Sequence, residues 1–278
     1  MTQTSILSVN CTNSSGLLGT HSDQRVCESL GVHCFSAVTV VVAAGPSGLY
    51  RWHPVPPRLV QAQIDAVTSL ASPGAVKVGT LGTGALAEAV AQRLARRRLS
   101  PIVVGPALLP RSADHPSTQR IRRAVQAILA SSVAAVLDAR DAGAIVRPGL
   151  TMPPADEAAQ ALAELGPALV LIVEGDASGP LRFVLRKPAD GLLTQWHLPP
   201  TQIDARAVCE AVSAAMTARL ALGDSPDQAL ASALCLMGCE PAGDNSDNSR
   251  LVRAFLTANS VQQGLAVRTP TTARAGDE

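Results

Sequence analysis

The chain has 278 residues, a net charge of +1 at pH 7, 47% hydrophobic residues and only 16% charged residues. This length can bury one large α/β core, and the balanced charge gives no electrostatic reason to expect nucleic acid or an acidic membrane as a partner. Aromatic residues make up 2% of the chain, which argues against stacking platforms for single-stranded nucleic acid.

Apolar runs and amphipathic segments alternate along the chain, which is typical of strands followed by helices. In chain order, the predicted elements are a strand at Ile6–Val9, a helix at Asp23–Leu30, a strand at Ser36–Ala43, a helix at Pro56–Val67, a strand at Ala75–Gly79, a helix at Thr83–Arg97, a strand at Pro101–Pro106, a helix at Thr118–Ala130, a strand at Ala144–Pro148, a helix at Pro154–Leu165, a strand at Ala168–Val173, an edge strand at Arg182–Arg186, and helices at Asp204–Leu222 and Ser225–Met237.

This alternation predicts an α/β fold with three layers, in which helices cover both faces of a central, mostly parallel sheet. Sheets of this kind bind ligands beyond the carboxyl ends of their strands. We expect one domain over residues 1–240. The polar residues 241–278 are expected to form a partly disordered extension, with a short helix at Leu251–Leu256 and a disordered tail at Thr269–Glu278.

The cysteines indicate a reducing compartment. They are irregularly spaced, and no CxxC pair completes a zinc set; the six are Cys11, Cys27, Cys34, Cys209, Cys235 and Cys239. We therefore expect buried, reduced thiols in a cytoplasmic protein and no metal site formed by them. No run of about 18 apolar residues predicts a membrane span, and the first ten residues lack the basic and apolar regions of a secretion signal.

Ungapped motifs in the first third of the chain carry a family resemblance. Asn10–Asp23 reads Asn-Cys-Thr-Asn-Ser-Ser-Gly-Leu-Leu-Gly-Thr-His-Ser-Asp and resembles Ala-Gly-Ser-Asp-Ser-Ser-Gly-Gly-Ala-Gly-Ile-Gln-Ala-Asp. Leu30–Thr39 resembles Leu-Gly-Val-Tyr-Gly-Met-Ser-Ala-Ile-Thr, and Ala75–Gly82 resembles Ala-Val-Lys-Thr-Gly-Met-Leu-Gly. These motifs are those of the hydroxymethylpyrimidine/phosphomethylpyrimidine kinases. The resemblance implies a ribokinase-like fold, a role in thiamine synthesis and a homodimer.

The resemblance implies a substrate-binding role for three positions. Asp23 matches an acidic residue that contacts the aminopyrimidine, and a carboxylate can accept hydrogen bonds from such a ring. The same residue is equally suited to the first turn of a helix. Ala44 stands where the family has Gln or Glu, and Thr80 stands where it has Met, so one polar contact to the ring is lost.

Lys77, Arg147 and Arg206 are the candidate contacts for phosphate or nucleotide. Lys77 could instead form a structural ion pair. The family's Thr-Pro-Asn-x-x-Glu motif is placed at residues 147–152, where Gly149 and Met152 replace Asn and Glu. Neither replacement offers a side-chain oxygen for Mg²⁺, and the family's Asp-Pro pair becomes Gly-Pro at residues 105–106, which removes another carboxylate.

The family's phosphate-binding loop Gly-Thr-Gly-Cys corresponds to Arg206, Ala207, Val208 and Cys209. Glycines let backbone N–H groups converge on a phosphate at a helix N-terminus, and the β-branched Val208 resists that conformation. We expect Asp204 to cap the helix about one turn early and to accept the hydrogen bonds that a phosphate would use. Cys209 holds the catalytic position that the resemblance implies; the alternative is a small, buried apolar side chain.

Three functions follow from these patterns. The first is a phosphomethylpyrimidine kinase-like protein with weak or lost kinase activity, a pseudoenzyme that keeps a small-molecule cleft. The alternative is an active kinase that uses ATP and Mg²⁺ to phosphorylate hydroxymethylpyrimidine, its phosphate or a related small alcohol. The third is a structural or regulatory partner that dimerises through the early strands. No cofactor is certain, since ATP and Mg²⁺ are needed only if the protein is active.

Overall fold

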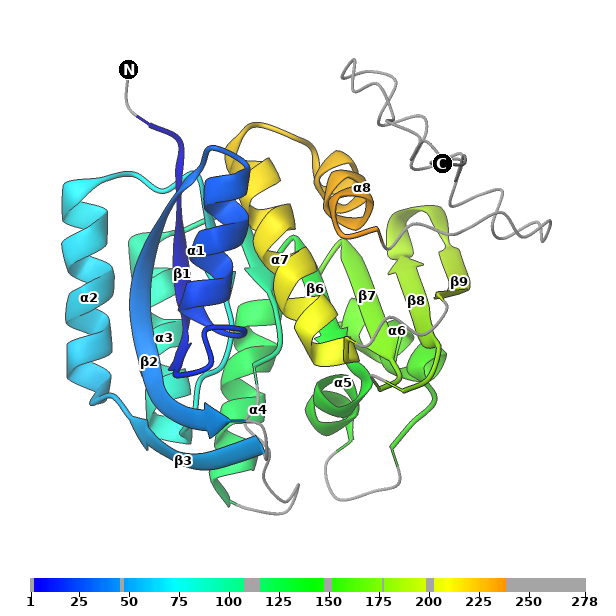
Figure 1. The fold of residues 1–278 in the computed structure, drawn as a ribbon, viewed down its shortest axis with the longest axis horizontal. Helices are drawn as coiled ribbons and strands as arrows, with labels where there is room; N and C mark the ends of the chain where they lie inside the picture. Colours follow the sequence, from blue (N-terminus) through cyan, green and yellow to red (C-terminus); the bar gives the residue numbers. More distant parts are fainter. Residues whose placement is uncertain are drawn as a thin grey trace, which may run out of the picture.

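The computed structural model describes residues 3–45, 48–107, 116–147, 152–176, 178–198 and 203–238. These residues form a nine-stranded sheet that is covered by helices. Its strands are β1 (Ser5–Asn13), β2 (His33–Gly45), β3 (Gly48–Pro54), β4 (Ala75–Val78), β5 (Ile102–Val104), β6 (Ala134–Asp138), β7 (Leu169–Glu174), β8 (Leu181–Lys187) and β9 (Leu192–Leu198). They lie side by side in the order β3-β2-β1-β4-β5-β6-β7-β8-β9 (Figure 1).

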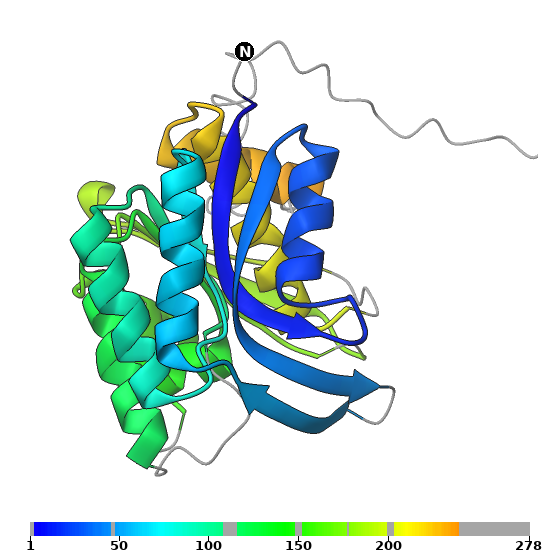
Figure 2. The same ribbon diagram turned by 90° about the vertical axis from the view of Figure 1, so that its left-hand side faces the viewer.

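The centre of the sheet is parallel, and both edges are antiparallel. β2, β1, β4, β5, β6 and β7 pair in parallel, while β3 runs antiparallel to β2, β8 antiparallel to β7, and β9 antiparallel to β8. Figure 2 shows the ribbon of β2 and β3 curving away from the rest of the sheet. The carboxyl ends of the parallel strands therefore all lie at the same end of the sheet, as in other sheets of this kind.

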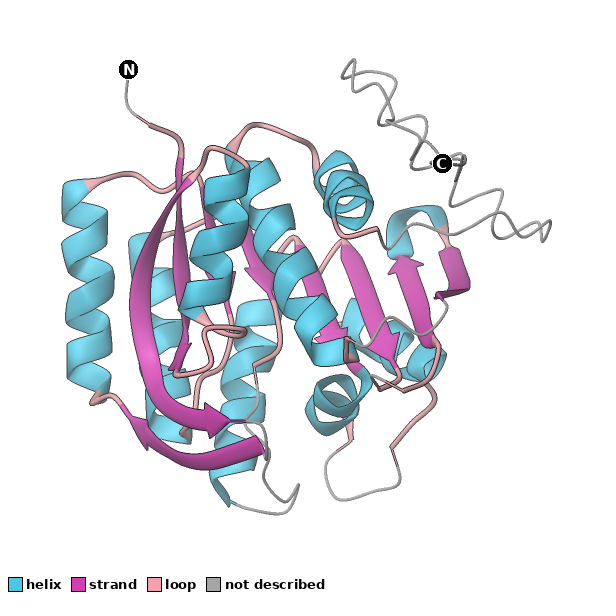
Figure 3. Cartoon of the chain, viewed as in Figure 1, coloured by secondary structure: helices cyan, strands magenta, loops and turns pink. Residues whose placement is uncertain are grey.

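Helices cover both faces of the sheet. They are α1 (Thr20–Ser29), α2 (Pro57–Leu70), α3 (Gly84–Arg97), α4 (Pro116–Leu129), α5 (Ala139–Val146), α6 (Ala155–Ala163), α7 (Ala205–Ala221) and α8 (Pro226–Leu236). One apolar cluster joins the sheet to α1, α7 and α8, and a second joins it to α2 through α6. Figures 1 and 3 show these helices on opposite sides of the strands, which confirms the predicted three-layer α/β/α fold.

The local sequence explains several helix ends. The Thr83 side chain accepts a hydrogen bond from the Leu86 N–H and so begins α3, as N-cap threonines do. Ser225 and Gln228 form a reciprocal capping box at the start of α8. α2 begins at Pro57, where the missing N–H of proline costs nothing.

The predicted strand at Ala144–Pro148 is wrong. Residues up to Val146 belong to α5, and the strand of this region is β6, ten residues earlier. All five residues of β6 are buried, and the Asp138 carboxylate at its end accepts a hydrogen bond from the Asp141 N–H at 2.9 Å and caps α5. Two short apolar runs follow each other here, and periodicity alone cannot separate a buried strand from a short helix.

The prediction of an edge strand at Arg182–Arg186 is also wrong, because β8 lies between β7 and β9. The actual edges, β3 and β9, were not predicted. Met152 begins a described segment, whereas Gly149, Cys239 and the predicted elements at Leu251–Leu256 and Thr269–Glu278 lie outside the described residues. None of the described helices has the length and apolar character needed to cross a membrane.

Candidate functional site

A fully buried lysine lies near the carboxyl end of β4. Lys77 has 0% exposure and is the largest fully buried side chain among the described residues. Its Nζ forms an ion pair with Asp23 on α1 and a second one with Glu210 Oε2 on α7 at 2.6 Å. It also donates to the Glu210 backbone oxygen at 3.1 Å. Lys77 therefore joins the sheet to α1 and α7 of one helical layer, at the ends of the strands where ligands of such sheets bind.

Asp23 has protein partners on both carboxylate oxygens. Lys77 donates to Oδ1, while the Ser8 hydroxyl and the Asn10 amide donate to Oδ2 at 2.6 Å and 3.1 Å. The side chain has 0% exposure. Burial raises the pKa of Asp23 above its usual value, although the charge of Lys77 opposes this shift. The structure thus places Asp23 in an internal network instead of on an open surface.

Glu210, which sequence reasoning missed, is the second acid of this network. It is 1% exposed, and its Oε2 accepts a hydrogen bond from the Asn10 amide at 3.2 Å in addition to that from Lys77. Burial alone would lower the pKa of Lys77, but the charges of Asp23 and Glu210 overcome it and raise that pKa. A single acid inside the Ala-rich, almost wholly buried helix α7 was the available sequence signal.

Arg206 forms a neighbouring cluster at the start of α7. Its Nη1 lies 3.4 Å from Asp138 Oδ2 and 3.5 Å from Asp141 Oδ1, and its Nη2 donates to Thr80 Oγ1 at 3.2 Å. Asp141 also accepts a hydrogen bond from the Ala107 N–H at 2.8 Å through its other oxygen. Burial would lower the pKa of Arg206, but the acidic neighbours raise it, so the guanidinium stays charged.

Two carboxylates therefore lie at the carboxyl end of β6, and sequence reasoning missed them. It placed the end of the strand near Arg147, with Gly149 and Met152 at the metal-supporting positions. The strand ends at Asp138, and Asp138 and Asp141 have the same three-residue spacing as the Asn and Glu of the family motif. Carboxylates at such a position can support Mg²⁺ or its water ligands.

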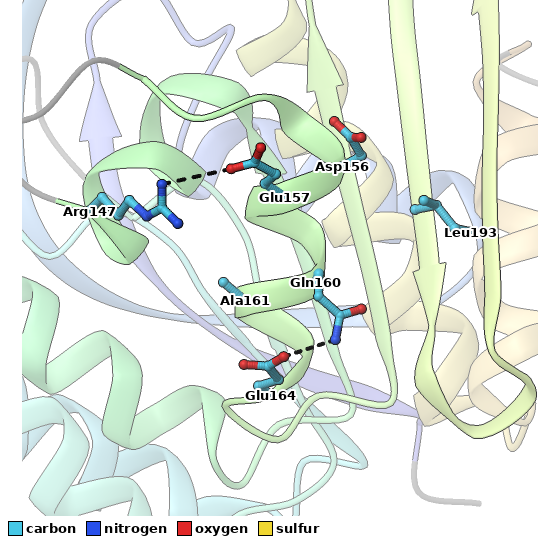
Figure 4. Close-up of a pocket in the computed structure, with 7 residues that line it drawn as sticks. All are labelled: Arg147, Asp156, Glu157, Gln160, Ala161, Glu164 and Leu193. Carbon is cyan, nitrogen blue, oxygen red and sulfur yellow. Dashed lines mark hydrogen bonds and ion pairs between the residues drawn. The ribbon is translucent and has the colours of Figure 1, made fainter.

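Arg147 lies elsewhere, at the end of α5. Its Nη1 is 3.7 Å from Glu157 Oε2, and both side chains are 56% exposed. Figure 4 shows it among the residues that line a pocket, most of which lie on α6 and one on β9. The residues that line this pocket are Arg147, Asp156, Glu157, Gln160, Ala161, Glu164 and Leu193. The ion pair of Arg147 with Glu157 is thus separate from the ion pairs of Lys77 and Arg206.

The structure brings Thr80 into the buried network but not Ala44. Thr80 is 1% exposed, and its N–H donates to Asn10 Oδ1 at 2.9 Å. Ala44 lies near the end of β2, where its backbone exchanges hydrogen bonds with the Ser14 hydroxyl. It packs with Trp52 against a small apolar cluster of Cys11, Val40 and Val42.

The start of α7 has the predicted conformation. The helix begins at Ala205, and the Asp204 carboxylate accepts a hydrogen bond from the Ala207 N–H at 2.7 Å. Cys209 lies in the second turn with 0% exposure, and burial raises its pKa well above the usual value. The thiol is therefore neutral at pH 7. Among the described residues, no three His, Cys, Asp or Glu side chains are grouped so that they could hold a metal ion by themselves.

We expect Asp204→Ala to lower the free energy of unfolding by about 1 kcal/mol, because the change removes the N-cap acceptor of α7. Urea denaturation measures this loss, and Asp204→Asn, which keeps an acceptor oxygen, is the control. The freed N–H groups can then bind an anion. Sulfate should therefore raise the Tm of Asp204→Ala more than that of the unaltered protein. Equal sulfate effects on both proteins would show that Asp204 does not compete with an anion.

Comparisons with known proteins agree with this geometry. A family model described as phosphomethylpyrimidine kinase matches residues 13–237. The hydroxymethylpyrimidine/phosphomethylpyrimidine kinase of Haemophilus influenzae is 31% identical over 104 residues, which are 37% of this chain and 39% of that protein. The corresponding kinase of Salmonella typhimurium is 32% identical over 149 residues, 50% of this chain and 56% of that protein. These matches thus span less than two thirds of the relatives' lengths.

Solved structures show the same fold. The phosphomethylpyrimidine kinase of Clostridium difficile 630 has a TM-score of 0.67 and 18% identity and covers 84% of this chain and 99% of its own. An ADP complex of Bacillus subtilis pyridoxal kinase has a TM-score of 0.73 and 22% identity, with coverage of 88% and 95%. The chain therefore has the ribokinase-like fold of these kinases.

Proposed function

Because the chain belongs to the phosphomethylpyrimidine kinase family, we propose that it binds a small pyrimidine-type ligand at the carboxyl ends of β1, β2 and β4 and transfers phosphate weakly or not at all. The observation that carries this proposal is the start of α7. There Asp204 accepts the hydrogen bond of a first-turn N–H group, so that donor is not available to a phosphate.

Charge also opposes an incoming phosphoryl group at this edge. The two clusters at the start of α7 contain two more acidic than basic side chains; their members are Asp23, Glu210, Asp138, Asp141, Lys77 and Arg206. Phosphoryl transfer depends on positioning and on neutralising the charge of the transferred group. An excess of carboxylates without a bound cation disfavours the anion, and this supports weak or absent transfer.

Neutral groups beside the network support the ligand cleft. Burial, with the charge of Glu210, raises the pKa of Cys11 to about 11, so its thiol is uncharged at pH 7. Cys11 packs with Val42, Ala44 and Trp52, and Thr80 lies next to Arg206. An apolar wall with a few polar groups is the usual form of a small-molecule site. Asp23, Ala44 and Thr80 are the positions that we propose for ligand contact.

A second candidate function is the active kinase, and Asp138 and Asp141 favour it. These two carboxylates could hold Mg²⁺ or its waters, and Arg206 between them could contact the transferred phosphoryl group. In this case Lys77, Arg147 and Arg206 are the proposed phosphate or nucleotide contacts, and Cys209 keeps the implied catalytic position. Under either function we propose that the protein is a cytoplasmic homodimer and that its ligand is a small molecule.

A kinase assay separates the two candidates. With Mg²⁺, ATP and hydroxymethylpyrimidine or its phosphate, we expect turnover far below the roughly 1–100 s⁻¹ of ordinary kinases. Pyrimidines should nevertheless raise the Tm, because a ligand that binds the folded state stabilises it. Ordinary turnover that Asp141→Asn abolishes would establish the active kinase. The absence of any Tm shift with pyrimidines would reject the cleft.

A further inference from the structure

A buried asparagine joins the two acidic side chains of the Lys77 network. Asn10 lies on β1 with 0% exposure. Its Nδ2 donates hydrogen bonds to Asp23 Oδ2 at 3.1 Å and to Glu210 Oε2 at 3.2 Å. Its Oδ1 accepts hydrogen bonds from the Cys11 and Thr80 N–H groups at 2.8 Å and 2.9 Å. The amide therefore uses both of its N–H groups and both lone pairs of its oxygen.

The orientation of this amide is fixed. Two backbone N–H groups face its oxygen and two carboxylates face its nitrogen, so the reverse assignment of oxygen and nitrogen would lose all four hydrogen bonds. The amide also lies close to the backbone that follows β4, where a Cβ atom at Gly79 would be 2.3 Å from Asn10 Cγ. Both shape and hydrogen bonds thus hold Asn10 in the network.

The hydrogen bond from Asn10 leaves no lone pair free on Asp23 Oδ2. A carboxylate oxygen has two lone pairs, and Oδ2 accepts from the Ser8 hydroxyl at 2.6 Å as well as from Asn10. Asn10 is two residues nearer than Ser8 to the carboxyl end of β1, which is the end of the proposed ligand cleft. A ligand that approaches Asp23 from this end therefore meets Asn10 first.

The Asn10 amide has the same hydrogen-bonding edge as an aminopyrimidine. A carboxamide places N–H donors next to an acceptor oxygen, and an aminopyrimidine places its amine next to an acceptor ring nitrogen. The protein surrounds the amide with a carboxylate acceptor on Asp23 and a backbone donor on Thr80. These are the partners that the polar edge of such a ring needs. A side chain of the protein therefore occupies the place that this edge would take.

We propose that Asn10 is an internal competitor for the ligand and keeps the amine of a pyrimidine away from Asp23. An amine that displaced Asn10 would replace one hydrogen bond with another and leave a buried amide without partners, so it would gain little. The cleft then holds a pyrimidine by its apolar wall and discriminates little between rings with and without an amine. This inference rests on the proposed function, because it concerns the same cleft.

Calorimetry with two matched pyrimidines tests the proposal on the unaltered protein. One is an aminopyrimidine that carries a hydroxymethyl group, and the other is the same molecule with hydrogen in place of the amine. We expect their Kd values to agree within about threefold. If Asp23 were free to accept from the amine, the first pyrimidine would bind about tenfold or more tightly, as expected for a hydrogen bond to a charged group.

Asn10→Ala provides the second arm of the test. The motif that residues 10–23 resemble has alanine at this position. The variant should bind the aminopyrimidine about tenfold more tightly than the amine-free ring, whereas a cleft that had merely loosened would change both affinities alike. Asn13→Ala is the matched control. Asn13 is also a buried residue of β1, but its Oδ1 accepts a hydrogen bond from the Ser15 N–H, so the two pyrimidines should still bind equally.

The outcomes separate this inference from the proposed function. If neither pyrimidine binds the unaltered protein, the proposed cleft and the inference both fail. If both bind and the amine improves binding tenfold in the unaltered protein, only the inference fails. Equal affinities in folded Asn10→Ala, or the same preference for the amine in Asn13→Ala, would also overturn it. The comparison on the unaltered protein needs no variant, so it decides the matter even if Asn10→Ala does not fold.

Discussion

Replacing Lys77 with methionine is expected to lower the free energy of unfolding by about 3–5 kcal/mol, because removing one partner of a buried ionic network leaves the other charges uncompensated. Asp23 and Glu210 would both remain inside the protein without a cation, since their exposures are 0% and 1%. Denaturation in urea, followed by circular dichroism, measures the loss.

The chain's other lysine provides a matched control. Lys187 forms ion pairs with Asp190 and Asp227, but it lies nearer the surface, with 19% of its side chain exposed. Lys187→Met should therefore cost only about 0–1 kcal/mol. If the two substitutions destabilise the protein equally, Lys77 is not the cation that neutralises the buried acids.

The loss of stability caused by Lys77→Met should depend on pH. Asp23 already has a raised pKa, and Lys77 acts to lower it, so the pKa rises further in Lys77→Met. A carboxyl group with a raised folded-state pKa contributes stability at low pH, and this contribution is lost as the pH rises through that pKa. The difference in free energy of unfolding between Lys77→Met and the unaltered protein should therefore become smaller as the pH falls from neutral. A difference that grows on acidification would contradict the assignment of ionised carboxylates.

We expect Gly19→Ala to destabilise the protein by about 3 kcal/mol or more, because a strained backbone and a steric clash coincide at this position. Gly19 has φ 75° and ψ −154°, and a Cβ atom there would lie 2.1 Å from the backbone oxygen of Cys11. This oxygen belongs to β1, so it cannot move away from the added methyl group without disturbing that strand. The Asp23 N–H also donates to the Gly19 oxygen at 3.0 Å, so the shift would displace Asp23.

Gly16 is the matched control for this substitution. It has a similar φ of 69°, but a Cβ atom there would meet nothing within 4 Å. Gly16→Ala should cost only the left-handed backbone penalty of about 1–2 kcal/mol. Thermal unfolding of both variants separates the cost of the left-handed backbone from the cost of the steric clash. Equal losses of stability would mean that β1 shifts to make room for the added methyl group.

Much of the fold could be predicted from short-range patterns. The helix predicted at Thr83–Arg97 is α3 at Gly84–Arg97, because Thr83 caps it and its apolar residues recur at helical spacing. The cap at Asp204 was predictable for the same reason, since a capping side chain and its target N–H are three residues apart. Both signals are local, so the sequence contains them in full.

The partners of Lys77 could not be predicted in this way. Lys77 and Glu210 are 133 residues apart in the chain, and no periodicity relates residues that only the sheet topology brings together. Asp138 was missed for a different reason. The apolar run before it was too short to be recognised as a strand, so the capping signal at the end of β6 was not used. β9 was missed as well, since an edge strand that is only partly buried has a weak pattern.

Helix α7 makes the two charged clusters mechanically dependent on each other. Arg206 and Glu210 are four residues apart, so they lie on the same face, about one 5.4 Å turn from each other. Arg206 reaches the loop after β4 and the end of β6, while Glu210 reaches β1 and β4. One inserted residue before Arg206 would turn the helix by about 100° and withdraw both side chains together. A molecule that displaces Arg206 and moves the start of α7 would therefore also shift Glu210 and its ion pair with Lys77.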